Sequence, residues 1–307
     1  MKQKTVERIV SCSGLGLHGG EKVNLSFHPA VPGTGIVFAV KGKQGTRFIR
    51  NSPELVVGTN LCTTLGHDGV TVSTVEHVLA AVHGLGLDNL LIEVEGNELP
   101  ILDGSAAPFV FLLRQAGIRV QQARKKVMAL KKPFSYQENG SWIKAVPAER
   151  FQVDYLIDFP HPLIGRQRFS YTGTDDAFVR EVSRARTFGF LHQVEDMQKK
   201  GLALGGSLEN AVVLDEYGVV NQEGLRFSDE PVRHKLLDFI GDLTQLPFTL
   251  VGSFQVYCSG HSLNNKFVRG LSQRAQELLQ PVRGGEYGLP ERLPGHEKRP
   301  AALGAAL

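Results

Sequence analysis

The sequence predicts an α+β protein built from two similar two-layer domains, each a sheet packed against helices. Three observations lead to this prediction. The chain has 307 residues, which is too many for one small core. Strand-like segments come first and helix-like segments follow, and the same order begins again after residue 128. The basic stretch "QQARKKV" separates the two series and reads as a linker.

The expected N-terminal domain covers residues 1–122. It begins with segments such as "TVERIVSC", "KVNLSFHP" and "GIVFAV", which alternate or run apolar between glycines and prolines, as strands do. "STVEHVLAAVHGLG" is predicted to be a helix, since its apolar residues recur on one face and glycines can end it. "LDNLLIEVEG" is then a strand and "SAAPFVFLLRQAG" a second helix.

Residues 123–128 are the expected linker, and residues 129–280 the expected C-terminal domain. Asn139–Gly140 predicts a hairpin turn, because this dipeptide tolerates positive φ. Helices are expected at about 174–200, at 232–243 and at about 261–280. The last residues, 281–307, are rich in proline, glycine and charge, so we expect a flexible tail.

The composition argues against several classes of protein. The contents of hydrophobic residues, 42%, and charged residues, 21%, are ordinary for a globular protein. A net charge of +3 argues against a nucleic-acid partner, and no apolar run is long enough to span a membrane. The N-terminus carries no apolar segment of a signal peptide. Three widely spaced cysteines favour a reducing compartment, so we expect a cytoplasmic protein. We also expect the protein to be a monomer.

The segment "VRHKLLDFIGDL" has a spacing that suits metal binding. His234, Asp238 and Asp242 are four residues apart and therefore follow one stripe of a helix. The opposite stripe is apolar and predicts a buried face. A histidine and a carboxylate one turn apart can hold a divalent metal from one rigid element. The alternative is that the polar stripe is only solvated.

His77 offers a third ligand, since it points away from the apolar stripe of its own predicted helix. Two histidines and a carboxylate leave one coordination position open, which is the composition of a catalytic zinc site. Glu76 is then the candidate general base for a water of lowered pKa. Two simpler roles stay open for these residues. Ser73 and Glu76 match a capping box, and His77 could be one more exposed histidine.

A hydrolase also needs an acid for the leaving group. His261, in "YCSGHSLNNK", lies at a predicted strand-to-helix turn. Asp242 could hold it by a hydrogen bond and favour the imidazolium form, although His261 could also be only a helix-start residue. The match of "GLGLHG" to a dinucleotide-binding motif is rejected, because a strand and not a helix follows it.

Five segments together resemble the UDP-3-O-acyl-N-acetylglucosamine deacetylases, zinc amidases of lipid A synthesis in Gram-negative bacteria. They are "STVEHVLAAVHGLGLDN", "PILDGSAAPFV", "SRARTFGF", "RHKLLDFIGDL" and "SGHSLNNK". The likeness keeps the same order from the first strand to about residue 280. It implies an active site at the interface of the two domains, one Zn²⁺ per chain, and hydrolysis of the N-acetyl group of an acylated UDP-N-acetylglucosamine.

The resemblance also implies a role for individual catalytic residues. Zinc would be bound by His77, His234 and Asp238. Glu76 would be the general base for the attacking water. His261, supported by Asp242, would protonate the leaving amine or stabilise the oxyanion, and Thr187 would hydrogen-bond the oxyanion. Lys235 would direct its charge at the sugar–phosphate part of the substrate.

Further residues are implied to contact the substrate. Phe159 resembles the residue that stacks on uracil, and Cys62 is expected near the site. The insert at about 188–210 resembles the apolar passage for the acyl chain. Its suitable residues, which could equally be ordinary core, are Phe188, Leu191, Leu202 and Leu204.

One position departs from the family pattern. Many members carry a lysine where this chain has Cys258, so a diphosphate contact is expected to be lost or moved. The candidates to replace it are Lys144, Arg166 and Arg168. His18, in "GLGLHGG", is typical of the family and is expected to border the site.

Two other functions stay open at this level. One is a nucleotide-sugar binding or regulatory protein without metal catalysis. The other is metal-free acid–base catalysis by Glu76 and His261, whose activity would survive chelators.

Overall fold

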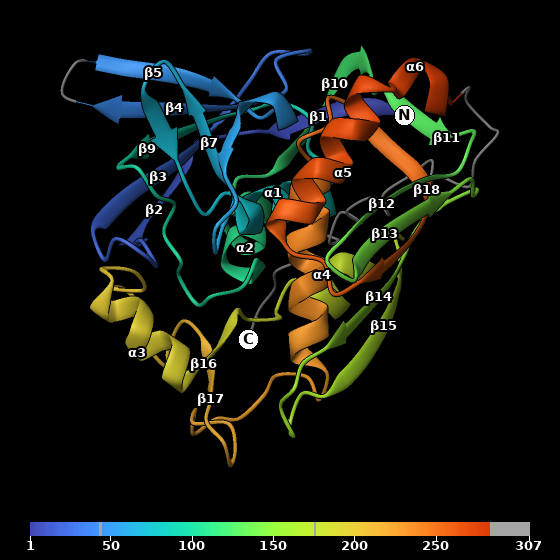
Figure 1. The fold of residues 1–307 in the computed structure, drawn as a ribbon. Coiled ribbons are helices and arrows are strands. Elements are labelled where there is room, and N and C mark those ends of the chain that lie inside the picture. The colour runs from blue at the N-terminus through green and yellow to red at the C-terminus, as the bar shows by residue number, and fades with distance from the viewer. Residues whose placement is uncertain (43–44, 175, 283–307) are drawn as a thin grey trace, which may run out of the picture.

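The structure is a computed structural model, and it describes residues 1–42, 45–174 and 176–282. The chain forms sheets that are covered by helices, which confirms the predicted α+β class (Figure 1). The division into two similar domains stays a prediction. One continuous hydrophobic core contains residues from both halves of the chain.

The first half of the chain forms a five-stranded sheet with the order β2-β3-β9-β4-β5. A second small sheet contains β6, β7 and β8, and β1 pairs with β10. The elements of this half are β1 (Lys2–Val6), β2 (Val10–Leu15), β3 (Lys22–Pro29), β4 (Ile36–Gly42), β5 (Gly45–Arg50), the 3₁₀ turn η1 (Pro53–Leu55), β6 (Val56–Gly58), β7 (Thr64–His67), β8 (Val70–Val72), α1 (Glu76–Gly84), β9 (Leu90–Glu95), α2 (Ala107–Gln115) and β10 (Ile118–Arg124).

The second half forms a seven-stranded sheet in which β14 and β18 are parallel neighbours. Its elements are β11 (Val127–Leu130), β12 (Phe134–Glu138), β13 (Ser141–Val146), β14 (Phe151–Asp158), β15 (Arg166–Thr172), the π-helical turn η2 (Phe178–Val182), β16 (Phe188–Phe190), α3 (Leu191–Lys199), β17 (Val212–Leu214), α4 (Glu230–Leu243), β18 (Thr249–Tyr257), α5 (His261–Gln273), α6 (Ala275–Leu278) and β19 (Leu279–Pro281).

Four helices, α1, α2, α4 and α5, lie between the two large sheets (Figure 1). The apolar stripe predicted for α4 faces the core, as Leu236, Phe239 and Ile240 are fully buried. The polar stripe of α4 is buried as well, so the alternative of a merely solvated face is wrong. Helix α3 lies at the edge of the molecule and has no buried residue.

Several sequence-based boundaries need correction. The expected linker at 123–128 is mostly strand, because β10 ends at Arg124 and β11 begins at Val127. The helix expected at 174–200 is broken by β16, which pairs in parallel with β17. The last predicted helix ends at Gln273, and the short α6 and β19 follow it. The hairpin at Asn139–Gly140 is confirmed, with both residues at positive φ.

Three expectations remain: the lack of a membrane-spanning segment, the state of the cysteines and the C-terminal tail. The described residues include no helix with the length and apolar character needed to span a membrane. Cys12, Cys62 and Cys258 are free thiols. The expected tail lies outside the described residues from position 283 onward.

Candidate metal and catalytic site

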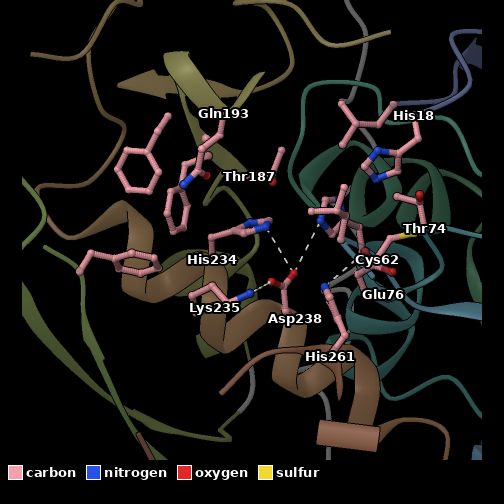
Figure 2. Close-up of a pocket in the computed structure, with 17 residues that line it drawn as sticks. His18, Cys62, Thr74, Glu76, Thr187, Gln193, His234, Lys235, Asp238 and His261 are labelled. Carbon is pink, nitrogen blue, oxygen red and sulfur yellow. Dashed lines mark hydrogen bonds and ion pairs between the residues drawn. The ribbon is translucent and has the colours of Figure 1, made fainter. Parts of the chain in front are cut away.

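The site begins with the close approach of two helices that are far apart in the sequence. A Cβ atom on Gly241 of α4 would lie 2.2 Å from the carbonyl oxygen of Glu76 in α1, so only glycine fits there. This contact brings the start of α1 against the polar stripe of α4. Figure 2 shows His234, Asp238, Glu76 and His261 pointing toward one another from these segments.

The predicted ligands His77, His234 and Asp238 meet in this contact. Their nearest ligand atoms all lie within 4.8 Å of one another, and all three side chains are buried. Asp238 Oδ1 lies 3.3 Å from His234 Nε2 and 3.7 Å from His77 Nε2. A tetrahedral ion with bonds of about 2.0–2.1 Å places its ligand atoms about 3.3 Å apart. The cluster is therefore compact enough to hold a metal ion.

A polar atom without a partner supports the same conclusion. Among the described residues, none donates a hydrogen bond to the buried Asp238 Oδ1. The other oxygen, Oδ2, accepts a hydrogen bond from Lys235 Nζ at 2.6 Å. A buried carboxylate oxygen is costly when it is left unpaired. Oδ1 faces both imidazoles, where a cation would satisfy it, so these residues fit a divalent metal.

The protonation states of the three residues also suit a metal. His234 Nδ1–H donates to the carbonyl oxygen of Ala185 at 3.1 Å, which leaves the lone pair on Nε2. Burial and the charge of His234 lower the pKa of His77 to about 3, so His77 is neutral at neutral pH. Burial raises the pKa of Asp238, but His234 and Lys235 outweigh it and hold that pKa below its ordinary value.

Glu76 and His261 face each other beside the ligands, with Glu76 Oε1 3.8 Å from His261 Nε2. Burial raises the pKa of Glu76 to about 7. Burial alone lowers the pKa of His261, but the carboxylates of Asp242 and Glu76 outweigh it and raise that pKa to about 9. A carboxylate that ionises near neutral pH and an imidazolium that stays charged are a base and an acid suited to work together.

The capping box at the start of α1 is not formed. Ser73 Oγ donates to the carbonyl oxygen of Asn97, and Thr74 turns the chain with a φ of 57°. Glu76 Oε2 accepts instead the backbone N–H of Thr63 at 3.0 Å. Since both Glu76 and His77 are buried, neither is explained by a cap or by an exposed helix face.

Asp242 holds His261, as its position one turn beyond Asp238 suggested. His261 Nδ1–H donates to Asp242 Oδ2 at 3.0 Å. Two residues that no sequence pattern indicated complete this pair. Thr63 Oγ1 donates to Asp242 Oδ1 at 2.6 Å, and Asn264 Nδ2 donates to Oδ2 at 2.8 Å.

A cavity of about 250 Å³ opens onto these groups (Figure 2). Its walls include four further residues expected from the family resemblance, Cys62, Phe159, Thr187 and Phe188, together with His18. Burial raises the pKa of the Cys62 thiol to about 11, so it is not a thiolate at neutral pH.

The expected acyl-chain leucines lie outside this cavity wall. Leu191 is 39% exposed and Leu204 is 54% exposed, so these two are not ordinary core residues. Leu202 is half-buried. The wall instead contains Phe190 and Gln193 from the same insert, which the sequence did not single out.

The three candidates for a diphosphate contact differ in their surroundings. Arg168 makes two hydrogen bonds to Asp154, both at 2.7 Å. Lys144 Nζ lies over the ring of Trp142, 4.5 Å from its centroid. Arg166 pairs in register with Asp158, the last residue of β14, directly before Phe159 of the cavity wall. Arg166 is therefore the candidate at the end of the sheet that faces the site.

Comparisons with known proteins give the family of this chain. The family model described as UDP-3-O-acyl N-acetylglycosamine deacetylase matches residues 3–273. A UDP-3-O-acyl-N-acetylglucosamine deacetylase from Nitratidesulfovibrio vulgaris is 51% identical over 303 residues, which cover 99% of this chain and 95% of the relative. One of the same name from Oleidesulfovibrio alaskensis is 51% identical over 92% of both chains. A third, from Histophilus somni, is 46% identical over 91% of this chain and 93% of its own. The chain therefore belongs to the UDP-3-O-acyl N-acetylglycosamine deacetylase family.

Proposed function

We propose that this chain uses zinc to hydrolyse the N-acetyl group of a UDP-3-O-acyl-N-acetylglucosamine, releasing acetate and the free amine in lipid A biosynthesis. The observation that carries the proposal is the arrangement at the cavity wall. Three buried ligand atoms face one point there, next to a carboxylate and an imidazole whose pKa values are shifted toward base and acid roles. The relatives' names support this choice of substrate.

Zinc held by His77, His234 and Asp238 would polarise the amide carbonyl and lower the pKa of the water that it binds. Hydrogen bonds with residues that do not bind the metal hold these ligands in place. Ala185 orients the ring of His234, and Lys235 binds the second oxygen of Asp238. Outer hydrogen bonds of this kind commonly decide how well a metal site is held.

Glu76 takes the proton from the attacking water. Its Oε2 is already bound by the N–H of Thr63, so the proton goes to Oε1, the oxygen that faces His261. The new C–O bond forms as that proton leaves the water. A carboxylate with a pKa of about 7 is a stronger base than an ordinary glutamate and is still ionised in part at neutral pH.

His261 supplies the proton for the leaving amine when the amide C–N bond breaks. Its Nδ1–H is committed to Asp242, so Nε2–H is the proton available to the substrate. Because its pKa is about 9, the imidazole carries both protons at neutral pH. An unactivated amide requires this protonation, since an amide anion is a very poor leaving group.

Thr187, in the cavity wall, would donate its hydroxyl to the developing oxyanion. Its backbone is held on both sides, by Gly104, which accepts its N–H at 2.8 Å, and by Val212, whose N–H donates to its carbonyl at 2.8 Å. A donor that is fixed before the reaction stabilises a developing charge at little reorganisation cost.

The nucleotide half of the substrate would lie along the end of the β14–β15 pair. Phe159 offers a face for the uracil ring, and Arg166 a charge for the diphosphate. Lys235 binds Asp238, and its ammonium also adds positive charge near the sugar. The acyl chain would pass along Phe188 and the half-buried and exposed leucines of the insert, where apolar surface is open to a ligand.

The test is acetate release from purified protein and UDP-3-O-(hydroxyacyl)-N-acetylglucosamine. Activity should be lost on chelation, return with one equivalent of zinc, and disappear with the bound metal in His234→Ala. His67→Ala, which removes an exposed histidine, is the matched control and should keep both. Activity that survives chelation would favour metal-free catalysis. Tight substrate binding without acetate release would favour a binding protein.

A further inference from the structure

Thr63 lies between the proposed base and the proposed acid. It directly precedes β7 and is only 1% exposed. Its backbone N–H donates to Glu76 Oε2 at 3.0 Å, and its hydroxyl donates to Asp242 Oδ1 at 2.6 Å. The same hydroxyl oxygen lies 3.3 Å from His261 Nδ1. One residue therefore contacts the base, the acid and the carboxylate that supports the acid.

The backbone of Thr63 is anchored to the helix that carries the base. The N–H of Val75, next to Glu76, approaches the carbonyl oxygen of Thr63 at 3.4 Å, while Thr63 N–H donates to the Glu76 carboxylate. The peptide of Thr63 is thus tied to the first turn of α1 at two points. Binding Oε2 leaves Oε1 as the oxygen that is free to accept a proton.

The hydroxyl completes the partners of Asp242. Oδ2 already accepts from His261 and Asn264, and Oδ1 accepts from Thr63 alone among the described residues. Because the hydroxyl has one proton and gives it to Asp242, its lone pair faces the Nδ1–H of His261. The ring of His261 is then held by two acceptors, Asp242 Oδ2 and Thr63 Oγ1. A buried carboxylate that loses one of its donors is free to rotate toward another.

We propose that Thr63 is a positioning residue for the reaction. It acts through Asp242 and Glu76. It keeps Glu76 Oε1, which accepts a proton, and His261 Nε2, which donates one, at fixed positions on either side of the substrate amide. The inference rests on the proposed hydrolase function. It adds to that function a residue that would not contact the substrate, because Thr63 is not among the residues that line the cavity.

The decisive variants are Thr63→Val and Thr63→Ser. Valine keeps the shape and the backbone N–H but removes the hydroxyl, whereas serine keeps the hydroxyl. Thr63→Val should lower kcat roughly 10- to 100-fold, the range expected for losing one hydrogen bond to a charged group, with KM and zinc content unchanged. Thr63→Ser should keep kcat within about threefold of wild type. Thr64→Val, a change at the adjacent half-buried threonine, is the matched control and should behave as wild type.

Two further measurements separate positioning from a loss of folding. Thr63→Val combined with Asp242→Asn should lose no more activity than Asp242→Asn alone, since both changes act on one unit. The downfield proton resonance of His261 Nδ1–H, identified by its loss in His261→Ala, should move in Thr63→Val and stay in Thr63→Ser. If Thr63→Val does not fold, Thr63→Ala takes its place in both measurements.

The failures of the two proposals can be told apart. Wild-type protein that releases no acetate would overturn the proposed function. Active wild-type protein with an unchanged kcat in Thr63→Val would overturn the role of Thr63 alone. A change in KM or a loss of zinc, without a fall in kcat, would overturn that role too.

Discussion

Asp242 sets the pH range in which the proposed reaction can run. Glu76 must be ionised to accept a proton, so the rate rises as pH passes its pKa of about 7. His261 must be protonated to donate one, so the rate falls as pH passes its pKa of about 9. The wild-type rate should therefore be highest near about pH 8, where roughly four-fifths of the molecules hold both groups in the working state.

Asp242→Asn removes the main interaction that raises the pKa of His261. The two groups are 3.0 Å apart, and an opposite charge at such a distance changes a pKa by about 1 to 3. The apparent pKa of the high-pH limb of the pH–rate profile should therefore fall to about 6–8. Asp242 also helps, after burial and Asp238, to raise the pKa of Glu76, so the low-pH limb should move down by less. With the pKa of Glu76 at about 7, a fall of about 2 in the pKa of His261 would lower the fraction of molecules with both groups in the working state to roughly one-quarter at the optimum.

The assay is the initial rate of acetate release between about pH 5 and pH 10, with bound zinc measured in each sample. Asp68→Asn is the matched control, because it removes the same charge from an exposed turn whose positive φ suits asparagine. If Asp242→Asn keeps the high-pH limb of wild type while zinc stays bound, Asp242 does not set the pKa of the acid and this role is refuted.

Glu76→Gln should keep bound zinc but lower kcat by about 10²–10⁴, and normal turnover in this variant would show that another group is the base. Gly241→Ala should destabilise the fold by about 1–3 kcal/mol in denaturant unfolding and weaken zinc binding, because a Cβ there meets the backbone of α1; an unchanged protein would contradict the close packing. Arg166→Ala should raise KM by about tenfold with kcat retained, whereas Arg168→Ala should change KM little, and equal effects in substrate titrations would argue against Arg166 as the diphosphate contact.

Local patterns in the sequence predicted one side of the site well. The four-residue spacing of His234, Asp238 and Asp242 follows from helical geometry, and the structure keeps these residues on one stripe of α4. The α+β class could also be predicted, because strand-like and helix-like periodicities are both local. The ends of helices and strands were predicted less well where pairing between distant strands determines them. β16 is a strand because β17 lies beside it.

The other side of the site depends on contacts between distant segments. Gly241 gives no local signal of its role, since its importance comes from the backbone of Glu76 against it. Thr63 likewise lies in an unremarkable segment, and only the folded chain brings it to both Glu76 and Asp242. The capping-box pattern at Ser73 was misleading for the same reason. The backbone N–H of Thr63, from another segment, binds the Glu76 carboxylate, which therefore does not cap the start of α1.

The central claim is that one metal ion joins α1 and α4 at the cavity wall. It is tested most directly by crystals of the protein grown with zinc and measured on both sides of the zinc absorption edge. We expect one anomalous peak per chain at about 2.0–2.2 Å from Nε2 of His77, Nε2 of His234 and an oxygen of Asp238. A zinc peak elsewhere, with these three residues free of metal, would contradict the claim.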